Sequence, residues 1–249
     1  MSNYDIEQNE EAERMFNDKL AAKYFAIWDE YPIQRFTNER EGEALRKAIR
    51  PGSQVLVIGS GGGRELPFLL ALGCEVIALD LSPEMLRIGQ ERFPDGKIEW
   101  RLGNANKLDF DENSLDGVVA LGGVTNYLLS LEGFACECGR ILRSDGVIVI
   151  DSFNSEFVGE SPATTTGGRL RTPYPVDQIE RALLRGGFTE VETVGLRYVV
   201  DLLPPAANAE PNHPARAGLL KILEGEAALQ GVMPARLAKF LLTTARRAT

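Results

Sequence analysis

The sequence contains few of the residues that enzymes use for nucleophilic or metal chemistry. Its 249 residues include one histidine, His213, which lies among prolines and is interpreted as a loop residue. We therefore expect neither a histidine-rich metal site nor a nucleophilic triad. The three cysteines predict no disulfide framework. Cys74 stands alone in the sequence, and Cys136 and Cys138, at i and i+2 of a predicted helix, point away from each other. Their odd number and the lack of a secretion signal predict a reducing, cytoplasmic location.

Basic residues and long apolar runs are also scarce. The chain has 27 Lys and Arg against 36 Asp and Glu, which gives a net charge of −9. Because a phosphate backbone repels an acidic protein, we expect no nucleic-acid partner. No apolar run approaches the ~20 residues that span a bilayer, so we expect no membrane-spanning segment. With 44% hydrophobic and 25% charged residues, the composition is that of a globular protein with one sizeable core.

Short apolar runs alternate with helical stretches between residues 51 and 150. The run at 55–58, Val-Leu-Val-Ile, has no polar alternation, which is typical of a strand covered on both faces in a parallel sheet. Strands that alternate with helices in this way form right-handed βαβ units. Five strands are expected at 55–58, 75–79, 98–102, 117–121 and 147–150, with helices at 64–72, 83–93 and 131–142.

The segments before residue 51 and after residue 150 do not show this alternation of strands and helices. Residues 1–50 contain two predicted helices, at 7–27 and 38–49, and are expected to form a helical extension. Residues 153–172 are rich in Gly, Pro and Thr, and we expect a long loop of the kind that often covers a site.

The C-terminal part supplies two further strands, at 188–200 and 237–245, after a helix at 175–185. Between these strands lies the insertion 201–236, which holds five prolines and a predicted helix. Its apolar leucines suggest that it docks, either as a cover over the acceptor pocket or against the outer helices of the sheet. The sequence thus predicts an α/β fold in which residues 51–249 form a doubly wound, mostly parallel, seven-stranded, Rossmann-like sheet.

The most informative feature is the glycine-rich stretch 59–63, Gly-Ser-Gly-Gly-Gly, between the first strand and the first helix. Glycines there let the backbone approach a ligand, and the amides at a helix N-terminus face an anionic group. The dinucleotide fingerprint G-x-G-x-x-G needs a glycine where this chain has Arg64. Asp80 ends the second strand 21 residues after Gly59, where a carboxylate can accept both hydroxyls of a ribose. Alternatively Asp80 caps the next helix, although Ser82 already serves that purpose.

Five stretches, taken in order, resemble the motifs of class I S-adenosylmethionine (SAM)-dependent methyltransferases, closest to the ubiquinone/menaquinone-type and small-molecule branch. They lie at 55–65, 76–85, 103–105, 115–119 and 141–146, and the resemblance runs from about residue 37 to about residue 200. It implies SAM as cofactor, S-adenosylhomocysteine (SAH) as product, a small-molecule acceptor, and an antiparallel hairpin of the last two strands. The cofactor-binding residues that it implies are Gly59, Ser60, Gly61, Gly63, Asp80, Leu81, Met85, Asn104, Ala105, Leu121 and Gly122.

Two residues depart from the pattern of the family. An acid usually stands two residues before the first glycine of the loop, but this chain has Val57 there. That departure predicts weaker SAM binding or a contact from elsewhere. Asn104 replaces the common Asp, and its amide oxygen can still accept from the adenine amino group with a loss of about 1 kcal/mol.

Methyl transfer from a sulfonium requires that the acceptor be held in line with the methyl group in a dry site, and it requires no protein nucleophile or metal. A general base is needed only for an acceptor that keeps its proton. The candidates for this base are Asp151 and Tyr127, whereas Asn126 and Tyr127 are candidates for orienting the acceptor; all three follow the fourth and fifth strands. They are equally compatible with a polar loop. Tyr24, Trp28 and Tyr31 lie at helical spacing near the N-terminus and are interpreted as core residues in preference to a lid.

Two other functions compete with this hypothesis. A nicotinamide-dependent oxidoreductase needs the third glycine and usually a Tyr-x-x-x-Lys pair, and the sequence has neither. A SAM-binding sensor without catalysis is favoured by Val57 and Asn104. The acceptor, the methylated atom and the oligomeric state (monomer or homodimer) are not encoded in any motif of the chain.

Overall fold

A seven-stranded sheet forms the centre of the molecule in a computed structural model that describes residues 3–94, 97–157, 164–166, 169–199, 208, 210–230 and 232–249. Its strand order is β3-β2-β1-β4-β5-β9-β8. The first five strands pair in parallel, and β9 pairs antiparallel with both β5 and β8. The strands are β1 (Gln54–Ile58), β2 (Glu75–Asp80), β3 (Ile98–Leu102), β4 (Leu115–Ala120), β5 (Leu142–Phe153), β8 (Phe188–Leu196) and β9 (Phe240–Arg247). This confirms the predicted doubly wound, mostly parallel sheet and its terminal hairpin.

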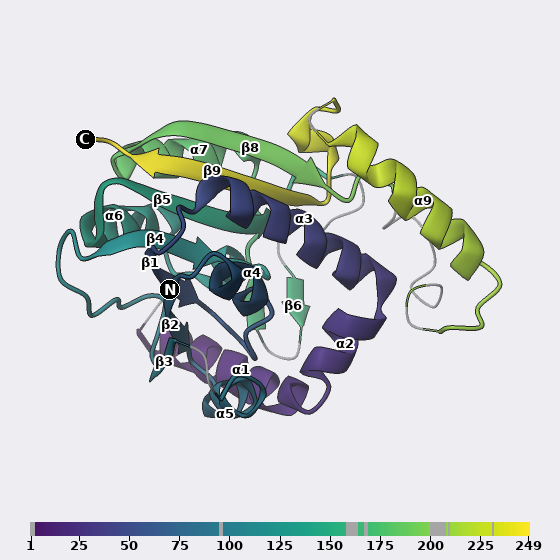
Figure 1. Ribbon diagram of the computed structural model, residues 1–249, viewed down its shortest axis with the longest axis horizontal. Coiled ribbons are helices and arrows are strands. Elements are labelled where there is room, and N and C mark those ends of the chain that lie inside the picture. The colour runs from purple at the N-terminus through teal and green to yellow at the C-terminus, as the bar shows by residue number, and fades with distance from the viewer. Residues whose placement is uncertain are drawn as a thin grey trace.

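Helices cover both faces of the sheet (Figure 1). α3 and α4 lie on one face, and α6 and α7 lie on the other. The helices are α1 (Asn3–Ala21), α2 (Tyr24–Glu30), α3 (Pro32–Ala48), α4 (Leu66–Ala71), α5 (Pro83–Arg92), α6 (Leu131–Ile141), α7 (Val176–Arg185) and α9 (Arg216–Leu229). Successive residues of a strand point to opposite faces, so β1 feeds two cores. Leu56 and Ile58 join the core under α6 and α7, whereas Val55 and Val57 join the core under α3 and α4. Burial on both faces explains the unbroken apolar run.

The N-terminal segment differs from its prediction in where its helices break. The helix expected at 7–27 is two helices, because the chain turns at residues 22–23 and the Lys23 N–H donates to the Leu20 carbonyl at 2.9 Å. The next helix begins at Pro32 instead of residue 38, since proline is suited to the first position of a helix. The turn leaves Tyr24 buried against the body of the protein.

The long loop and the last strands also differ in detail. Within 153–172, β6 (Thr164–Thr166) and β7 (Arg169–Arg171) pair as a short antiparallel hairpin. β8 ends at Leu196 instead of residue 200, and the following Arg197 has a φ of 64°, a left-handed conformation that ends extended pairing. β9 begins at Phe240, because Ala235–Leu237 forms the 3₁₀ turn η3.

The described part of the insertion packs against an outer helix of the sheet. Leu219 and Leu223 of α9 form an apolar cluster with Ile33 of α3, and the two helices lie side by side in Figure 1. The buried carboxylate of Glu226 accepts the backbone N–H of Tyr198 at 2.8 Å, which ties α9 to the end of β8. Residues 201–207, 209 and 231 of the insertion lie outside the described part of the chain.

Candidate functional site

A cavity of about 300 Å³ opens at the carboxyl ends of β1, β2 and β4, and we call it the glycine-loop cavity. Ligands of doubly wound sheets bind at this edge. Of the expected cofactor-binding residues, those that line it are Gly59, Gly61, Asp80, Leu81, Met85, Asn104, Ala105, Leu121 and Gly122. Ser60 and Gly63 do not line it. The Gly63 N–H donates to the Ser60 carbonyl at 2.8 Å, so these two residues shape the turn from within.

The backbone of the loop requires glycine at its key positions. Gly59, Gly61 and Gly63 have φ values of 65°, 51° and 86°, in the left-handed region that glycine adopts without strain. A Cβ on Gly61 would also lie 2.8 Å from the hydroxyl oxygen of Tyr24. The G-x-G-x-G spacing therefore follows from the path of the chain.

Asp80 holds the loop through both carboxylate oxygens. Oδ2 accepts the Gly61 N–H at 2.7 Å, and Oδ1 accepts the Ser82 N–H at 2.8 Å. Burial raises the pKa of Asp80 above its usual value, although these two N–H groups lower it. Each oxygen keeps a second lone pair for a ligand hydroxyl. The N-cap of α5 is Ser82, whose Oγ accepts the Met85 N–H at 3.0 Å, so Asp80 is not needed as a cap.

The end of β3 forms the opposite wall of the cavity. Oδ1 of Asn104 accepts the Asn106 N–H at 2.9 Å, and Ala105 lies beside it on the cavity wall. Asn106 was not predicted. Its Oδ1 accepts the Leu129 N–H at 2.9 Å and its Nδ2 donates to Glu10 at 3.3 Å, so it joins this wall to α1.

Of the three candidates for catalysis, only Tyr127 lines the cavity. Asp151 is 1% exposed, and it accepts the N–H groups of Gly122 at 2.9 Å and Gly123 at 2.7 Å. Burial and the nearby Glu41 raise its pKa well above its usual range. Asp151 therefore has the geometry of a side chain that positions the turn after β4, and its part in catalysis stays a prediction.

Asn126 is buried among polar partners in a similar way, and its part in orienting the acceptor stays a prediction. Its Oδ1 accepts the Phe153 N–H at 2.9 Å, and its Nδ2 donates to Ser152 Oγ at 3.0 Å and to the Thr172 carbonyl at 2.8 Å. The side chain is 1% exposed. It joins its own turn to the end of β5 and to the segment after β7, and it is not among the residues that line the cavity.

Arg64, which sequence reasoning used only to exclude a dinucleotide fingerprint, also lines the cavity. Its side chain is 3% exposed and pairs with Glu41, and its Nε lies 2.9 Å from Glu65 Oε1. The guanidinium carbon lies 4.1 Å from the ring centre of Trp28. Burial lowers the pKa of Arg64, but the nearby Glu41, Glu65, Tyr24 and Asp151 together raise it above its usual value, so the group stays charged. The sequence signal that could have identified Arg64 as a residue of the site is its position directly after the glycine loop.

The N-terminal helices close one side of the cavity. Tyr24 and Trp28 of α2 line it, and Tyr24 is also buried in an apolar cluster, whereas Tyr31 is not among the lining residues; a lid formed by these residues stays a prediction. The residues of α1 that line it are Glu10, Glu13, Phe16, Asn17 and Leu20. Ser82 Oγ donates to Asp18 at 2.6 Å, which holds α1 on the start of α5. None of the described residues of the insertion lines this cavity, so a cover formed by 201–236 stays a prediction.

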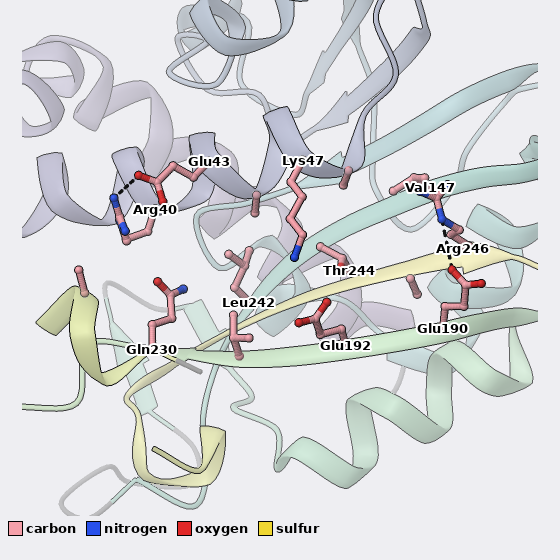
Figure 2. A pocket seen from close by; sticks show the side chains of 15 residues that line it. Arg40, Glu43, Lys47, Val147, Glu190, Glu192, Gln230, Leu242, Thr244 and Arg246 are labelled. Carbon is pink, nitrogen blue, oxygen red and sulfur yellow. Dashed lines mark hydrogen bonds and ion pairs between the residues drawn. The ribbon is translucent and has the colours of Figure 1, made fainter. Parts of the chain in front are cut away.

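A second cavity, of about 490 Å³, lies between α3, β8, β9 and the end of α9 (Figure 2). Its arginines are already paired, Arg40 with Glu43 and Arg246 with Glu190. Lys47 points across it toward β8 and β9. It contains none of the predicted site residues, so the glycine-loop cavity is the candidate site. Within the described ranges no cluster of three or more metal-binding side chains occurs, and no helix has the length and apolarity to cross a membrane.

Comparison with known proteins agrees with this geometry. Residues 56–150 match a family model described as a methyltransferase domain. A demethylmenaquinone methyltransferase of Renibacterium salmoninarum is 30% identical over 174 residues, which cover 70% of this chain and 68% of that protein. One from Tropheryma whipplei is 31% identical over 107 residues, 43% of this chain and 44% of that protein, so the chain spans less than half the length of some relatives.

Solved structures show the same fold at low sequence identity. A putative methyltransferase of Haloferax volcanii, in complex with the Trm112 methyltransferase activator, superposes with a TM-score of 0.69 at 19% identity, covering 94% of this chain and 98% of that one. Phosphoethanolamine N-methyltransferase 2 of Haemonchus contortus, in complex with SAM, superposes with a TM-score of 0.64 at 18% identity, covering 93% of this chain and 57% of that one.

Proposed function

This chain belongs to the class I SAM-dependent methyltransferases, whose cofactor is SAM, and we propose that it transfers a methyl group from SAM to a small-molecule acceptor. One observation carries the proposal. The glycine loop, Asp80 and Asn104 come from three separate stretches of the chain, and all line one cavity.

The residues present fit SAM. Asp80 keeps two lone pairs on its cavity side for the ribose hydroxyls, and Asn104 and Ala105 offer an oxygen and an N–H to adenine. Gly122 leaves room beside the backbone for the methionyl part, because among the described residues a Cβ there would meet only Arg64, at 3.5 Å. When bound, SAM supplies the electrophilic methyl group. The protein holds the acceptor in line with that methyl and excludes water from it.

The acceptor end of the cavity supports an apolar small molecule. Phe16, Leu128 and Phe153 line the cavity together with Tyr127. An aromatic ring packs well on such a wall, while the phenol can orient one polar atom. Relatives named as demethylmenaquinone methyltransferases support an acceptor with a quinone-type ring. The net charge of −9 disfavours nucleic acid, and the three free cysteines support action in the cytoplasm.

The test is transfer of labelled methyl from SAM into a cell extract that is then separated into small-molecule, protein and nucleic-acid fractions. We expect the label in the small-molecule fraction with the wild-type protein and almost none with Asp80→Ala. Label in the protein or nucleic-acid fraction contradicts the proposed acceptor. Binding of SAM without any transfer identifies a sensor without catalysis instead.

A further inference from the structure

The cavity of Figure 2, between α3, β8 and β9, has the size of a small-molecule site. Its volume is about 490 Å³, and such sites typically measure about 300–1,000 Å³. Val194 and Leu242 give it an apolar floor, and Ala44 and Ala48 of α3 leave space beside that floor because their side chains are short. Within the described part of the chain, it shares no lining residue with the glycine-loop cavity. A ligand here therefore leaves the glycine loop free.

The charges that line this cavity balance each other. Three basic and three acidic side chains line it, namely Arg40, Lys47, Arg246, Glu43, Glu190 and Glu192. Four of these form ion pairs, Arg40 with Glu43 and Arg246 with Glu190. Among the described residues, the side chains of Lys47 and Glu192 form no ion pair and no hydrogen bond. One charge of each sign therefore remains for a ligand that has no net charge.

Lys47 and Glu192 lie on opposite sides of the cavity. Lys47 extends from α3 toward β8 and β9, whereas Glu192 extends from β8, opposite Thr244 of β9 in the register of the sheet (Figure 2). Their charged ends face the same cavity without pairing with each other. Such an arrangement can hold the two opposite charges of one ligand, because the ammonium donates to a carboxylate and the carboxylate accepts from an ammonium.

The two arginines of the cavity each keep one donor in reserve. Arg40 Nε and Arg246 Nη1 are buried, and neither makes a hydrogen bond within the described ranges. Native proteins keep few buried donors without a partner, because each has given up its hydrogen bond to water. Both nitrogens therefore favour a ligand that brings oxygen acceptors, such as a carboxylate.

The backbone of β8 is distorted where it lines the cavity. Thr189 lies opposite Arg246 and Glu192 lies opposite Thr244, so β8 has one extra residue between these two pairs. Glu190, within this bulge, has a φ of 50°, in the left-handed region that residues other than glycine rarely adopt. Its carboxylate lies 3.3 Å from Arg246 Nε. Bulges of this kind redirect side chains beside binding sites, and this one holds Arg246 by Nε and leaves Nη1 available.

We propose that this cavity binds a zwitterionic small molecule of the amino-acid class that carries an apolar side chain. Lys47 binds its carboxylate and Glu192 binds its ammonium group. The apolar side chain packs on Val194 and Leu242. The proposal is independent of the methyltransferase activity, because the two cavities are separate. If Lys47 and Glu192 are only solvated surface charges, no amino acid binds between them.

The test is an NMR titration of the wild-type protein with L-leucine, L-methionine and L-phenylalanine, with and without saturating SAH. We expect saturable, millimolar binding of at least one of the three, unchanged by SAH. Two analogues of leucine keep only one charge each, 4-methylpentanoate the carboxylate and isoamylamine the ammonium. Both should bind at least about tenfold more weakly than L-leucine, since each lacks one charged hydrogen bond. Glycine, which lacks the apolar side chain, should also bind more weakly.

Lys47→Met and Glu192→Gln should each weaken amino-acid binding about tenfold, and both positions are exposed, so we expect both variants to fold. Arg35→Met is the matched control, because Arg35 is an exposed residue of α3 that is not among the lining residues. The proposal is overturned if none of the three amino acids binds, if the analogues bind as well as leucine, or if the two variants bind like the wild type. Displacement of the amino acid by SAH also overturns it, because the amino acid then occupies the glycine-loop cavity. A failure to bind SAH concerns the proposed function alone.

Discussion

Replacement of Asp80 by alanine tests the ribose site. The carboxylate is buried, and each oxygen already accepts one backbone N–H of the loop, at 2.7 Å from Gly61 and 2.8 Å from Ser82. Asp80 lines the cavity, and the lone pair left on each oxygen suits one hydroxyl of a ribose. Asp80→Ala removes both the ribose acceptors and the anchor of the loop.

The expected loss of SAH affinity can be estimated from the number of hydrogen bonds that the Asp80 carboxylate makes to the ribose. A hydrogen bond to a charged group contributes about 1.5–3 kcal/mol, and a loss of 1.4 kcal/mol is tenfold in affinity. With two ribose hydroxyls at stake, we expect SAH affinity to fall at least tenfold. The N–H groups of Gly61 and Ser82 also lose their acceptors, so we expect a lower free energy of unfolding as well.

Calorimetry with SAH measures the affinity, and thermal unfolding measures the stability of the same samples. Asp116→Ala is the matched control. The Asp116 carboxylate also accepts a backbone N–H, that of Gln54 at 2.8 Å, but it is not among the residues that line the glycine-loop cavity. The control should lose stability and keep its SAH affinity. An unchanged affinity in folded Asp80→Ala means that the ribose is bound elsewhere.

Three further predictions concern the surroundings of the site. Tyr24→Ala should weaken SAH binding and lower the melting temperature, because Tyr24 is buried against the loop, whereas Tyr31→Ala should leave affinity unchanged; equal effects in calorimetry contradict this. Burial raises the pKa of Glu65 to about 7 although Arg64 lowers it, so the folded state holds a proton that the unfolded state releases near 4.5. The Glu65 contribution to the free energy of unfolding should therefore fall by up to about 3 kcal/mol as pH rises from about 5 to 8, and Glu65→Gln should reduce the slope in urea titrations at several pH values without abolishing it, because Asp80 and Asp151 also have raised pKa values. A variant that joins residues 200 and 237 through a Gly-Ser turn should fold and keep its SAH affinity, because no described residue of the insertion lines the cavity. If it also keeps full turnover of the acceptor, the insertion does not cover the pocket.

The central sheet could be predicted because its determinants are local. The apolar runs of β1, β2 and β4 exceed what a half-exposed strand needs, and glycines and aspartates mark their ends. Asp80 could be assigned for the same reason, since its distance from Gly59 places it at the mouth of the sheet. Features that depend on sequence spacing alone could thus be predicted without a structure.

The roles of Asp151, Asn126 and Arg64 depend on partners that are distant in the sequence. Asp151 accepts N–H groups 28 and 29 positions before it, and Arg64 pairs with Glu41, 23 positions before it. A polar side chain after a strand predicts a place near the site but does not tell a ligand contact from a support behind the wall. The break between α1 and α2 likewise follows from the docking of Tyr24, a tertiary contact.

The most direct test of the account is calorimetry of the wild-type protein with SAM, SAH, NADH and NADPH under one set of conditions. We expect micromolar binding of SAM and SAH and no binding of either nicotinamide cofactor, because the loop has Arg64 where the dinucleotide fingerprint needs glycine. Binding of NADH or NADPH without binding of SAM and SAH contradicts the account.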